Sequence, residues 1–446
     1  MLEMKEAGEL KELRLRLHGL TVFRALLEDP VVARLDSLLA AVCACTDGPA
    51  GTGNTVGAGN AIEAGNAIDA GNVGNAAGAG NAEDAVRAVD AYSAFAAAVY
   101  EAGGDWSSYL LDAVLRSENL HVRCVAAGTP PTEELTEALH WELRLLQRLS
   151  AFDGAALREA LGGPGTLPRW RTQPLDFRAQ YEEHLRSLGR HGYGIYAQYS
   201  VFTVQDGALR PVKHPDLQPL DTLSGYERER GLVIANTRAL LEGRPASNVL
   251  LYGDAGTGKS STIKAVAGAF AQEGLRLVEV KKNQLYQIPD LVETLCANPL
   301  KFILFIDDLS FSANDDDFAA LKAILEGSVG GRGANVAVYA TSNRRHLVKE
   351  TFSDRAGDEI HLADTVQELM SLSARFGLTI TFTRPDKELY CHIVCRLALL
   401  YGIDLPETEL LTRAEAYAIR SGGRTPRAAR QFVELLKAEV MRGGGE

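Results

Sequence analysis

The chain has 446 residues, more than one hydrophobic core usually serves, so its length predicts two or three domains. A formal net charge of −12 argues against a protein that coats nucleic acid by bulk electrostatics. No stretch reaches the roughly 18 consecutive apolar residues of a membrane span, and the charged N-terminus lacks the apolar core of a secretory signal, so we expect a cytoplasmic protein with no membrane association.

The first segment, residues 1–45, is expected to form N-terminal helices. Five apolar side chains recur there at the spacing of one helical stripe: Val31, Leu35, Leu38, Leu39 and Val42. A stripe of this kind predicts a helix with one buried face. The segment contains no chemical motif.

Residues 46–83 are rich in Gly and Asn, and Gly-Asn recurs there at intervals of six residues. A six-residue period can mark a β-helix, whose stacked coils bury an aliphatic ladder. Only Ile62 and Ile68 could form such a ladder, which is too little to bury a core. The segment is therefore interpreted as a low-complexity linker.

Residues 84–170 again have helical patterning and are expected to form a helical N-terminal domain for docking or packing. Thr132 follows two prolines and is a candidate N-cap. Residues 171–215 are a mixed segment, in which Asp206-Gly207 separates two β-favouring runs and predicts a β-hairpin.

A glycine-rich turn follows the short apolar run Val249–Tyr252. The sequence Gly253-x-x-x-x-Gly258-Lys259-Ser260, with a strand before it and a helix after it, is the pattern of a phosphate-binding P-loop. Backbone N–H groups of such a turn converge on phosphates, the lysine reaches the β- and γ-phosphates, and the hydroxyl of the serine ligates Mg²⁺. The residues expected to bind the nucleotide here are Gly253, Asp254, Ala255, Gly256, Thr257, Gly258, Lys259, Ser260 and Ser261.

Two adjacent carboxylates, Asp307 and Asp308, end the apolar run KFILFI. A buried strand has little reason to end in like charges unless a cation or solvent lies beside them. A P-loop protein needs such a second strand tip beside the first. We expect Asp307 to lie on the magnesium side and Asp308 to polarise the attacking water.

The order of elements predicts the fold class. Further strands are expected at residues 275–280, 335–343 and 377–383, which gives five strands alternating with helices in a doubly wound parallel sheet. The nucleotide-binding core is placed at residues 216–385 and a helical lid at 386–442. Asn343 follows the fourth strand at the phosphate edge, where its side chain can hold the lytic water.

With these motifs in place, residues 217–438 resemble an AAA+ ATPase, with Gly253–Ser260 as Walker A, Asp307-Asp308 as Walker B and Asn343 as sensor 1. More narrowly, the chain is similar to an uncharacterised bacterial AAA+ family, a predicted ATPase. The resemblance implies that Arg427 is the sensor 2 arginine. It also implies that the adenine is bordered by Leu223, Gly225 and Tyr226.

Arg375 resembles an arginine finger, which acts on the γ-phosphate of a neighbouring subunit. The resemblance therefore implies a homo-oligomer, expected to be a ring, with ATP and Mg²⁺ as cofactors. The client, a protein or a nucleic acid, is not disclosed by the sequence.

The sequence departs from most of this family at Asp308, where glutamate is usual. The shorter side chain lies on the order of 1 Å farther from the water, which can slow hydrolysis. The favoured function is an ATPase that uses hydrolysis to remodel or load a macromolecular partner. The alternative is an ATP-dependent binding switch or assembly scaffold with little turnover.

Overall fold

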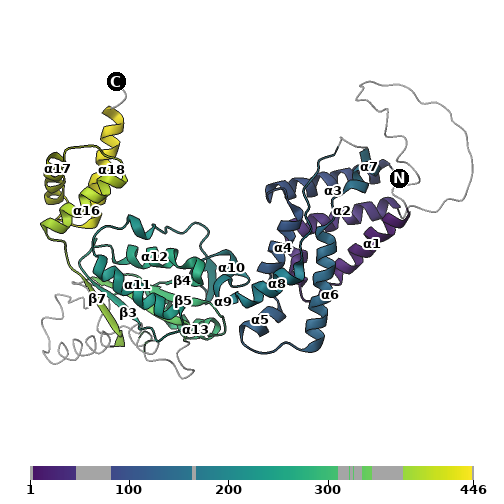
Figure 1. Cartoon of the computed structure of the whole chain (residues 1–446), viewed down its shortest axis with the longest axis horizontal. Coiled ribbons are helices and arrows are strands. Elements are labelled where there is room, and N and C mark those ends of the chain that lie inside the picture. The colour runs from purple at the N-terminus through teal and green to yellow at the C-terminus, as the bar shows by residue number, and fades with distance from the viewer. Residues whose placement is uncertain are drawn as a thin grey trace, which may run out of the picture. The chain divides into compact units, whose positions relative to one another are not determined.

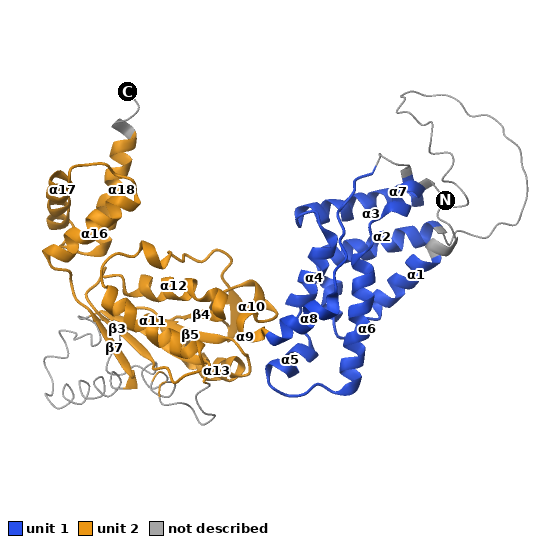
Figure 2. Ribbon diagram, in the orientation of Figure 1, with its two compact units in different colours: residues 1–186 blue, residues 187–446 orange. Residues whose placement is uncertain are grey.

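A computed structural model of the chain describes residues 4–46, 82–162, 167–309, 321, 325, 334–343 and 375–443. The chain divides into two compact units, Met1–Arg186 and Ser187–Glu446 (Figure 2). The Gly/Asn-rich segment lies almost entirely outside the described residues, so its assignment as a linker stays a prediction. No helix within the described ranges is long and apolar enough to cross a membrane.

The described part of the first unit is helical (Figure 1). The predicted stripe, which lies on α2 (Pro30–Thr46), is confirmed, because all five of its side chains are buried in the core of this unit. Thr132 is the N-cap of α6 (Glu133–Ser150), as predicted, and its side chain accepts a hydrogen bond from the Leu135 N–H. The helices are α1 (Met4–His18), η1 (Arg24–Glu28), α2 (Pro30–Thr46), α3 (Ala82–Glu101), α4 (Trp106–Arg116), α5 (Leu120–Ala126), α6 (Glu133–Ser150), α7 (Ala155–Gly162) and α8 (Phe177–Arg186).

A buried carboxylate on α6 hydrogen-bonds to the segment that follows α1. The side chain of Glu142 is 1% exposed. Its carboxylate accepts the backbone N–H groups of Thr21, Val22 and Phe23 at 2.7, 3.0 and 2.9 Å, and the Thr21 hydroxyl at 2.8 Å. These four hydrogen bonds compensate the desolvation of the charge and fix the turn between α1 and η1 against α6.

The second unit contains a seven-stranded sheet in the order β2-β1-β4-β5-β6-β3-β7. The five strands predicted for the nucleotide-binding core are all present and pair in parallel. They are β3 (Val249–Gly253), β4 (Leu275–Val280), β5 (Lys301–Ile306), β6 (Val336–Asn343) and β7 (Leu378–Phe382).

Helices cover both faces of this sheet, which explains why its strands are almost continuously apolar. Phe302, Leu304 and Ile306 of β5 pack on one face with α13 (Ile288–Cys296). Ile303 and Phe305 pack on the other face with α11 (Glu227–Leu241) and α12 (Lys259–Ala269) (Figure 1). Shorter helices fill the connections: α9 (Leu188–His191), α10 (Ile195–Gln198), η3 (Leu220–Thr222), η4 (Ala271–Glu273) and η5 (Lys282–Gln287).

The sheet has two more strands than the sequence predicted for the core. The expected hairpin at Asp206-Gly207 is confirmed as β1 (Val201–Gln205) and β2 (Ala208–Pro211), which pair antiparallel. β1 also pairs in parallel with β4, so the hairpin extends the sheet. Its buried side chains Phe202 and Val204 complete the face that α13 covers. Residues 171–215, expected as one mixed segment, are thereby divided between the two units.

Three helices follow β7 and pack on one another: α16 (Lys387–Leu400), α17 (Glu407–Arg420) and α18 (Pro426–Gly443). Their shared core includes Ile393, Leu410 and Phe432. They form the helical lid expected after the core. The predicted fold class, a doubly wound P-loop sheet with a C-terminal helical lid behind a helical N-terminal region, is confirmed.

Replacing Glu142 by Ala in the full chain should destabilise the first unit by about 3 kcal/mol or more, because buried N–H groups would lose their acceptor. Chemical denaturation followed by circular dichroism measures this change. The exposed Glu137 on the same helix provides the matched control, and Glu137→Ala should change the stability by less than about 0.5 kcal/mol. Equal effects of the two substitutions would contradict the assigned role of Glu142.

Candidate functional site

The register of the sheet brings three strand ends to one edge. Gly253 of β3 lies opposite Asn343 of β6, and Ile306 of β5 lies opposite Ala340 of the same strand. The residues that follow β3 and β5 therefore emerge beside the end of β6. This is the edge at which open α/β sheets bind ligands.

The turn after β3 needs glycine at particular positions. Gly256 and Gly258 have φ values of +77° and +90°, a left-handed region that glycine enters without steric cost. A Cβ on Gly253 would lie 2.0 Å from the carbonyl oxygen of Phe382, so this position also requires glycine. The turn ends at Lys259, the first residue of α12, so the N–H groups of this helix face the site.

The ammonium group of Lys259 lies inside the turn. Its Nζ donates to the carbonyl oxygens of Gly253 and Asp254 at 3.1 and 2.7 Å, and to Asn343 Oδ1 at 3.0 Å. The residue is 6% exposed, and this burial lowers the pKa of the ammonium. The carboxylates of Asp254, Asp308 and Asp307 act in the opposite direction and favour the charged form.

Asp307 is a hydrogen-bond centre. Its Oδ1 accepts the hydroxyl groups of Ser260 and Thr341, each at 2.6 Å, and the Asp308 N–H at 3.1 Å. The two residues predicted to lie beside a magnesium ion, Ser260 and Asp307, are therefore in direct contact. Hydroxyl and carboxylate oxygens are the hard ligands that Mg²⁺ prefers.

Asp308 has a left-handed backbone, with φ of +52°, which is uncommon for a residue other than glycine. Its N–H donates to Thr341 Oγ1 at 2.9 Å. Its Oδ1 accepts the amide Nδ2 of Asn343 at 2.7 Å. Because Asn343 also accepts from Lys259, one amide side chain connects the predicted phosphate lysine with the predicted water-polarising carboxylate.

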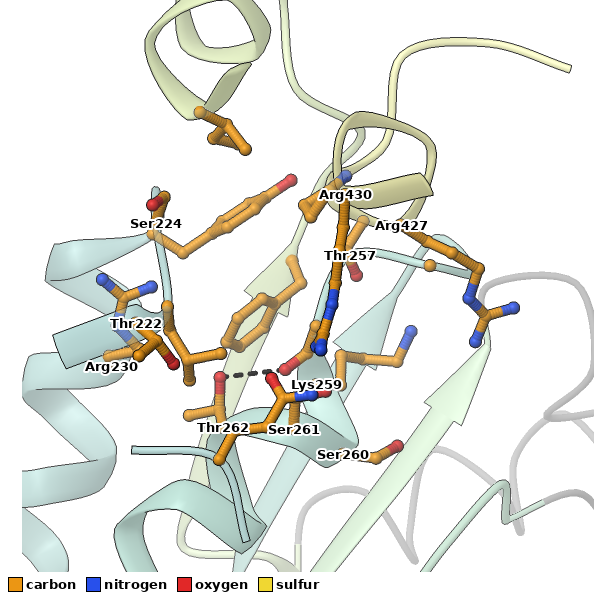
Figure 3. A pocket seen from close by; sticks show the side chains of 18 of the residues that line it. Thr222, Ser224, Arg230, Thr257, Lys259, Ser260, Ser261, Thr262, Arg427 and Arg430 are labelled. Carbon is orange, nitrogen blue, oxygen red and sulfur yellow. Dashed lines mark hydrogen bonds between the residues drawn. The ribbon is translucent and has the colours of Figure 1, made fainter. Parts of the chain in front are cut away.

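A cavity of about 770 Å³ opens over these groups. Figure 3 shows Lys259, Ser260 and Ser261 at the start of α12, with Arg427 and Arg430 reaching the cavity from α18. The Arg427 N–H donates to the carbonyl oxygen of Gly256 at 3.2 Å, so the first turn of α18 contacts the glycine-rich turn. The cavity is lined by these predicted site residues: Leu223, Tyr226, Ala255, Gly256, Thr257, Gly258, Lys259, Ser260, Ser261, Asp307, Asp308, Asn343 and Arg427.

The cavity also has an apolar wall. Tyr226 and Phe382 are part of it and pack with ring centroids 5.1 Å apart. The Tyr226 hydroxyl donates to the carbonyl oxygen of Thr383 at 2.6 Å, which fixes the ring. The lid contributes Ile393, Leu397, Leu400 and Tyr401 to the apolar lining. Apolar walls of this kind suit a flat aromatic ring.

Three predicted site residues lie beside the cavity without lining it, and their contacts are with the backbone or the lid. Gly225, at φ of +76°, lies where a Cβ would come within 2.9 Å of Ile393, so it allows α16 to approach. Gly253 contributes its carbonyl oxygen to Lys259. Asp254 Oδ2 accepts the Arg384 N–H at 2.9 Å and thus contacts the connector between β7 and α16.

Arg375 is not brought into this site. It lies just before β7, whose first residue, Leu378, pairs with Val249, whereas its last residue, Phe382, pairs with Gly253. Arg375 is therefore at the opposite edge of the sheet from the glycine-rich turn, and it does not line the cavity.

Sequence reasoning missed several cavity residues. Thr341 could have been found, because it lies two residues before Asn343 on the same face of β6. Arg230 is 9% exposed and bonds to Glu227 and to the Gly225 carbonyl oxygen, but its run of alternating charges gave no sign of burial. The remaining ones are Gln218, Pro219, Thr222, Ser224, Thr262, Phe382, Ile393, Leu397, Leu400, Tyr401, Pro426 and Arg430.

A known protein family matches most of the second unit. Residues 196–440, more than half of the chain, match the family described as "Protein of unknown function (DUF815)". Among curated proteins, none matches the chain significantly.

Several solved structures are similar over about half of the chain. The RuvB Holliday junction branch migration motor of Thermotoga maritima has 19% sequence identity and a TM-score of 0.33, over 48% of this chain and 63% of that one. The ORC2 protein of Aeropyrum pernix has 17% identity and a TM-score of 0.38, over 52% and 66%. AMPPCP-bound DnaA from Aquifex aeolicus has 14% identity and a TM-score of 0.36, over 50% and 67%.

Replacing Asp254 by Ala should loosen the connector, because the Arg384 N–H would lose its carboxylate acceptor. We expect the Arg384 amide to exchange with deuterium about tenfold faster in the full chain, measured by hydrogen exchange with mass spectrometry. Asp404→Ala, at an exposed position in the lid, serves as the control. An unchanged exchange rate at Arg384 in Asp254→Ala would contradict the assigned contact.

Proposed function

The chain belongs to the DUF815 family. From this premise and the parallel sheet with its glycine-rich turn, we propose that it is an AAA+ ATPase that binds Mg-ATP and uses hydrolysis to remodel or load a macromolecular partner. The observation that carries the proposal is the hydrogen-bonded series Lys259–Asn343–Asp308 beside the Ser260–Asp307 contact. These contacts bring the ammonium of Lys259 and the carboxylates of Asp307 and Asp308 together at one edge of the sheet.

The phosphate end is supported by the donors around the turn. Lys259 carries a buried positive charge among carbonyl acceptors, and phosphate oxygens would be stronger acceptors for the same N–H bonds. The backbone N–H groups of the turn and of α12 add further donors. Arg427 lies beside this turn, bonded to it through its backbone N–H, and would add a second cation from the lid.

The residues present fit a magnesium ion. Ser260 and Asp307 bring a hydroxyl and a carboxylate oxygen together at 2.6 Å, and Thr341 orients that carboxylate. Mg²⁺ bound there would neutralise charge on the phosphates during transfer. The role of the chain is to hold these two oxygens at the strand end.

Asp308 is the proposed acceptor for the attacking water. Its backbone is held by Thr341 and its Oδ1 by Asn343. Fixing the carboxylate in this way orients it without further rearrangement during the reaction. Asn343 thereby acts as a positioning residue as well as a neighbour of Lys259.

Arg375 is proposed to act in trans. It lies at the sheet edge away from its own cavity, so it can reach a triphosphate only if that nucleotide belongs to another subunit. This supports a homo-oligomer, which we propose to be a ring. Its client is proposed to be a protein or a nucleic acid.

The second candidate function is an ATP-dependent binding switch with little turnover. One observation favours it: Asp308 is short, and its Oδ1 already accepts a hydrogen bond from Asn343. That oxygen is already used as an acceptor, so it is less available to accept a proton from an attacking water. Tight ATP binding without phosphate release would support this candidate.

Phosphate release from ATP and Mg²⁺ separates the two functions. We expect the wild type to hydrolyse ATP, Lys259→Ala to lose ATP binding, and Asp308→Asn to bind ATP but hydrolyse it at least about a hundredfold more slowly. Asp290→Asn, an exposed substitution on α13, should behave as the wild type. Wild-type hydrolysis in Asp308→Asn would exclude Asp308 as the water-polarising group.

Mixing two inactive variants tests the arginine finger. Arg375→Ala keeps its own Asp308, and Asp308→Asn keeps its Arg375, so a mixed oligomer contains some complete sites. If Arg375 acts in trans, equal mixing should restore about one quarter of the wild-type rate, because about that fraction of random interfaces is complete. No recovery in oligomers shown by native mass spectrometry to be mixed would refute action in trans.

A further inference from the structure

Two arginines of α18 face the cavity, and the proposed function uses only the first. Arg427 and Arg430 both line the cavity of about 770 Å³ and are three residues apart on one face of the helix (Figure 3). They are separated by about 4.5 Å along the helix axis. The inference drawn from Arg430 rests on the proposed binding of ATP.

The two arginines lie at different distances from the glycine-rich turn. Arg427 is bonded to the turn through its N–H and the carbonyl oxygen of Gly256. Arg430 lies one helical turn farther on and shares the acceptor Glu434 Oε1 with the hydroxyl of Tyr401, a residue of the apolar lining. Arg430 is therefore placed between the phosphate turn and the wall that would hold the base.

Arg430 is held by an acceptor that is easily exchanged. Its Nε donates to Glu434 Oε1 at 2.9 Å, and the Tyr401 hydroxyl donates to the same oxygen at 3.0 Å. The side chains of Arg430 and Glu434 are each 44% exposed, so the pair is solvated and contributes little to stability. A phosphate group offers the guanidinium two parallel charge-assisted hydrogen bonds in its place.

We propose that Arg430 binds the α-phosphate of the nucleotide and leaves Glu434 when it does so. The α-phosphate lies between the base and the terminal phosphates, which is the position of Arg430 between Tyr401 and the turn. Because ATP and ADP share this phosphate, Arg430 contributes equally to the binding of both. Glu434, a residue of the lid, competes with the nucleotide for the guanidinium and so lowers the affinity of the site for the nucleotide.

Affinities of the full chain for ATP and ADP, measured by isothermal titration calorimetry with Mg²⁺, test this proposal. Arg430→Ala should weaken both nucleotides by about tenfold or more, and Arg430→Lys should weaken them less. Glu434→Gln should strengthen both by about two- to fivefold, because the amide still accepts from Tyr401 but no longer holds the guanidinium as an ion pair. Opposite signs for the two partners of one ion pair are not expected from a loss of folding.

The lid provides a matched control. Arg424 pairs with Glu415 at 2.9 Å, on the same lid but outside the cavity lining, so Arg424→Ala should leave both affinities unchanged. An Arg430→Ala variant that binds as the wild type, or a Glu434→Gln variant that binds more weakly, would overturn the inference alone. A wild type that binds neither nucleotide would overturn the proposed function, and the inference with it.

Discussion

The site depends on the register of three parallel strands. Backbone hydrogen bonds between β3 and β6 set Gly253 opposite Asn343, and those between β5 and β6 set Ile306 opposite Ala340. Side chains alternate between the two faces of a strand, so a slip of β6 by one residue would turn Asn343 and Thr341 to the other face of the sheet. Lys259 would then lose its bond to Asn343, and the two aspartates would lose their bonds with Thr341 and Asn343. The apolar side chains on both faces of β5 fix this register, because each must fit its own helical layer.

Burial and charge are balanced at the strand ends. Burial of Lys259 inside the turn lowers the pKa of its ammonium, and the neighbouring carboxylates of Asp254, Asp308 and Asp307 oppose this effect. The two adjacent carboxylates have different partners. Asp307 accepts three donors through a single oxygen, whereas Asp308, at a left-handed backbone position, accepts the amide of Asn343. That conformation costs on the order of 1 kcal/mol, and the hydrogen bond that Asp308 donates to Thr341 and the one that it accepts from Asn343 offset it.

Features encoded in a short stretch of sequence were predictable. The five core strands, the glycine-rich turn, the stripe of α2 and the Thr132 cap each depend on residues close together in the chain. The partner of a buried charge was not predictable in this way, because it is set by how distant elements meet. Glu142 accepts from residues about 120 positions earlier, and the charged run around Arg230 reads as a solvated helix face although the guanidinium is buried. The position of β1 beside β4 was open for the same reason, since a hairpin signal does not say which strand it joins.

The hydrogen bonds between the glycine-rich turn and the lid could not be predicted from the sequence. Arg384 and Arg427 each donate a backbone N–H to the glycine-rich turn, to the Asp254 carboxylate and the Gly256 carbonyl oxygen, and Tyr226 donates to the backbone of Thr383. On the side of the lid and the connector, each of these bonds is made by a backbone group. Such a bond depends on the course of the backbone and does not depend on the identity of the side chain at that position. A displacement of the turn must therefore either break these bonds or carry the connector and the start of α18 with it. Because the same turn holds Lys259, the site that would bind phosphate and the orientation of the lid are constrained by one short segment of backbone.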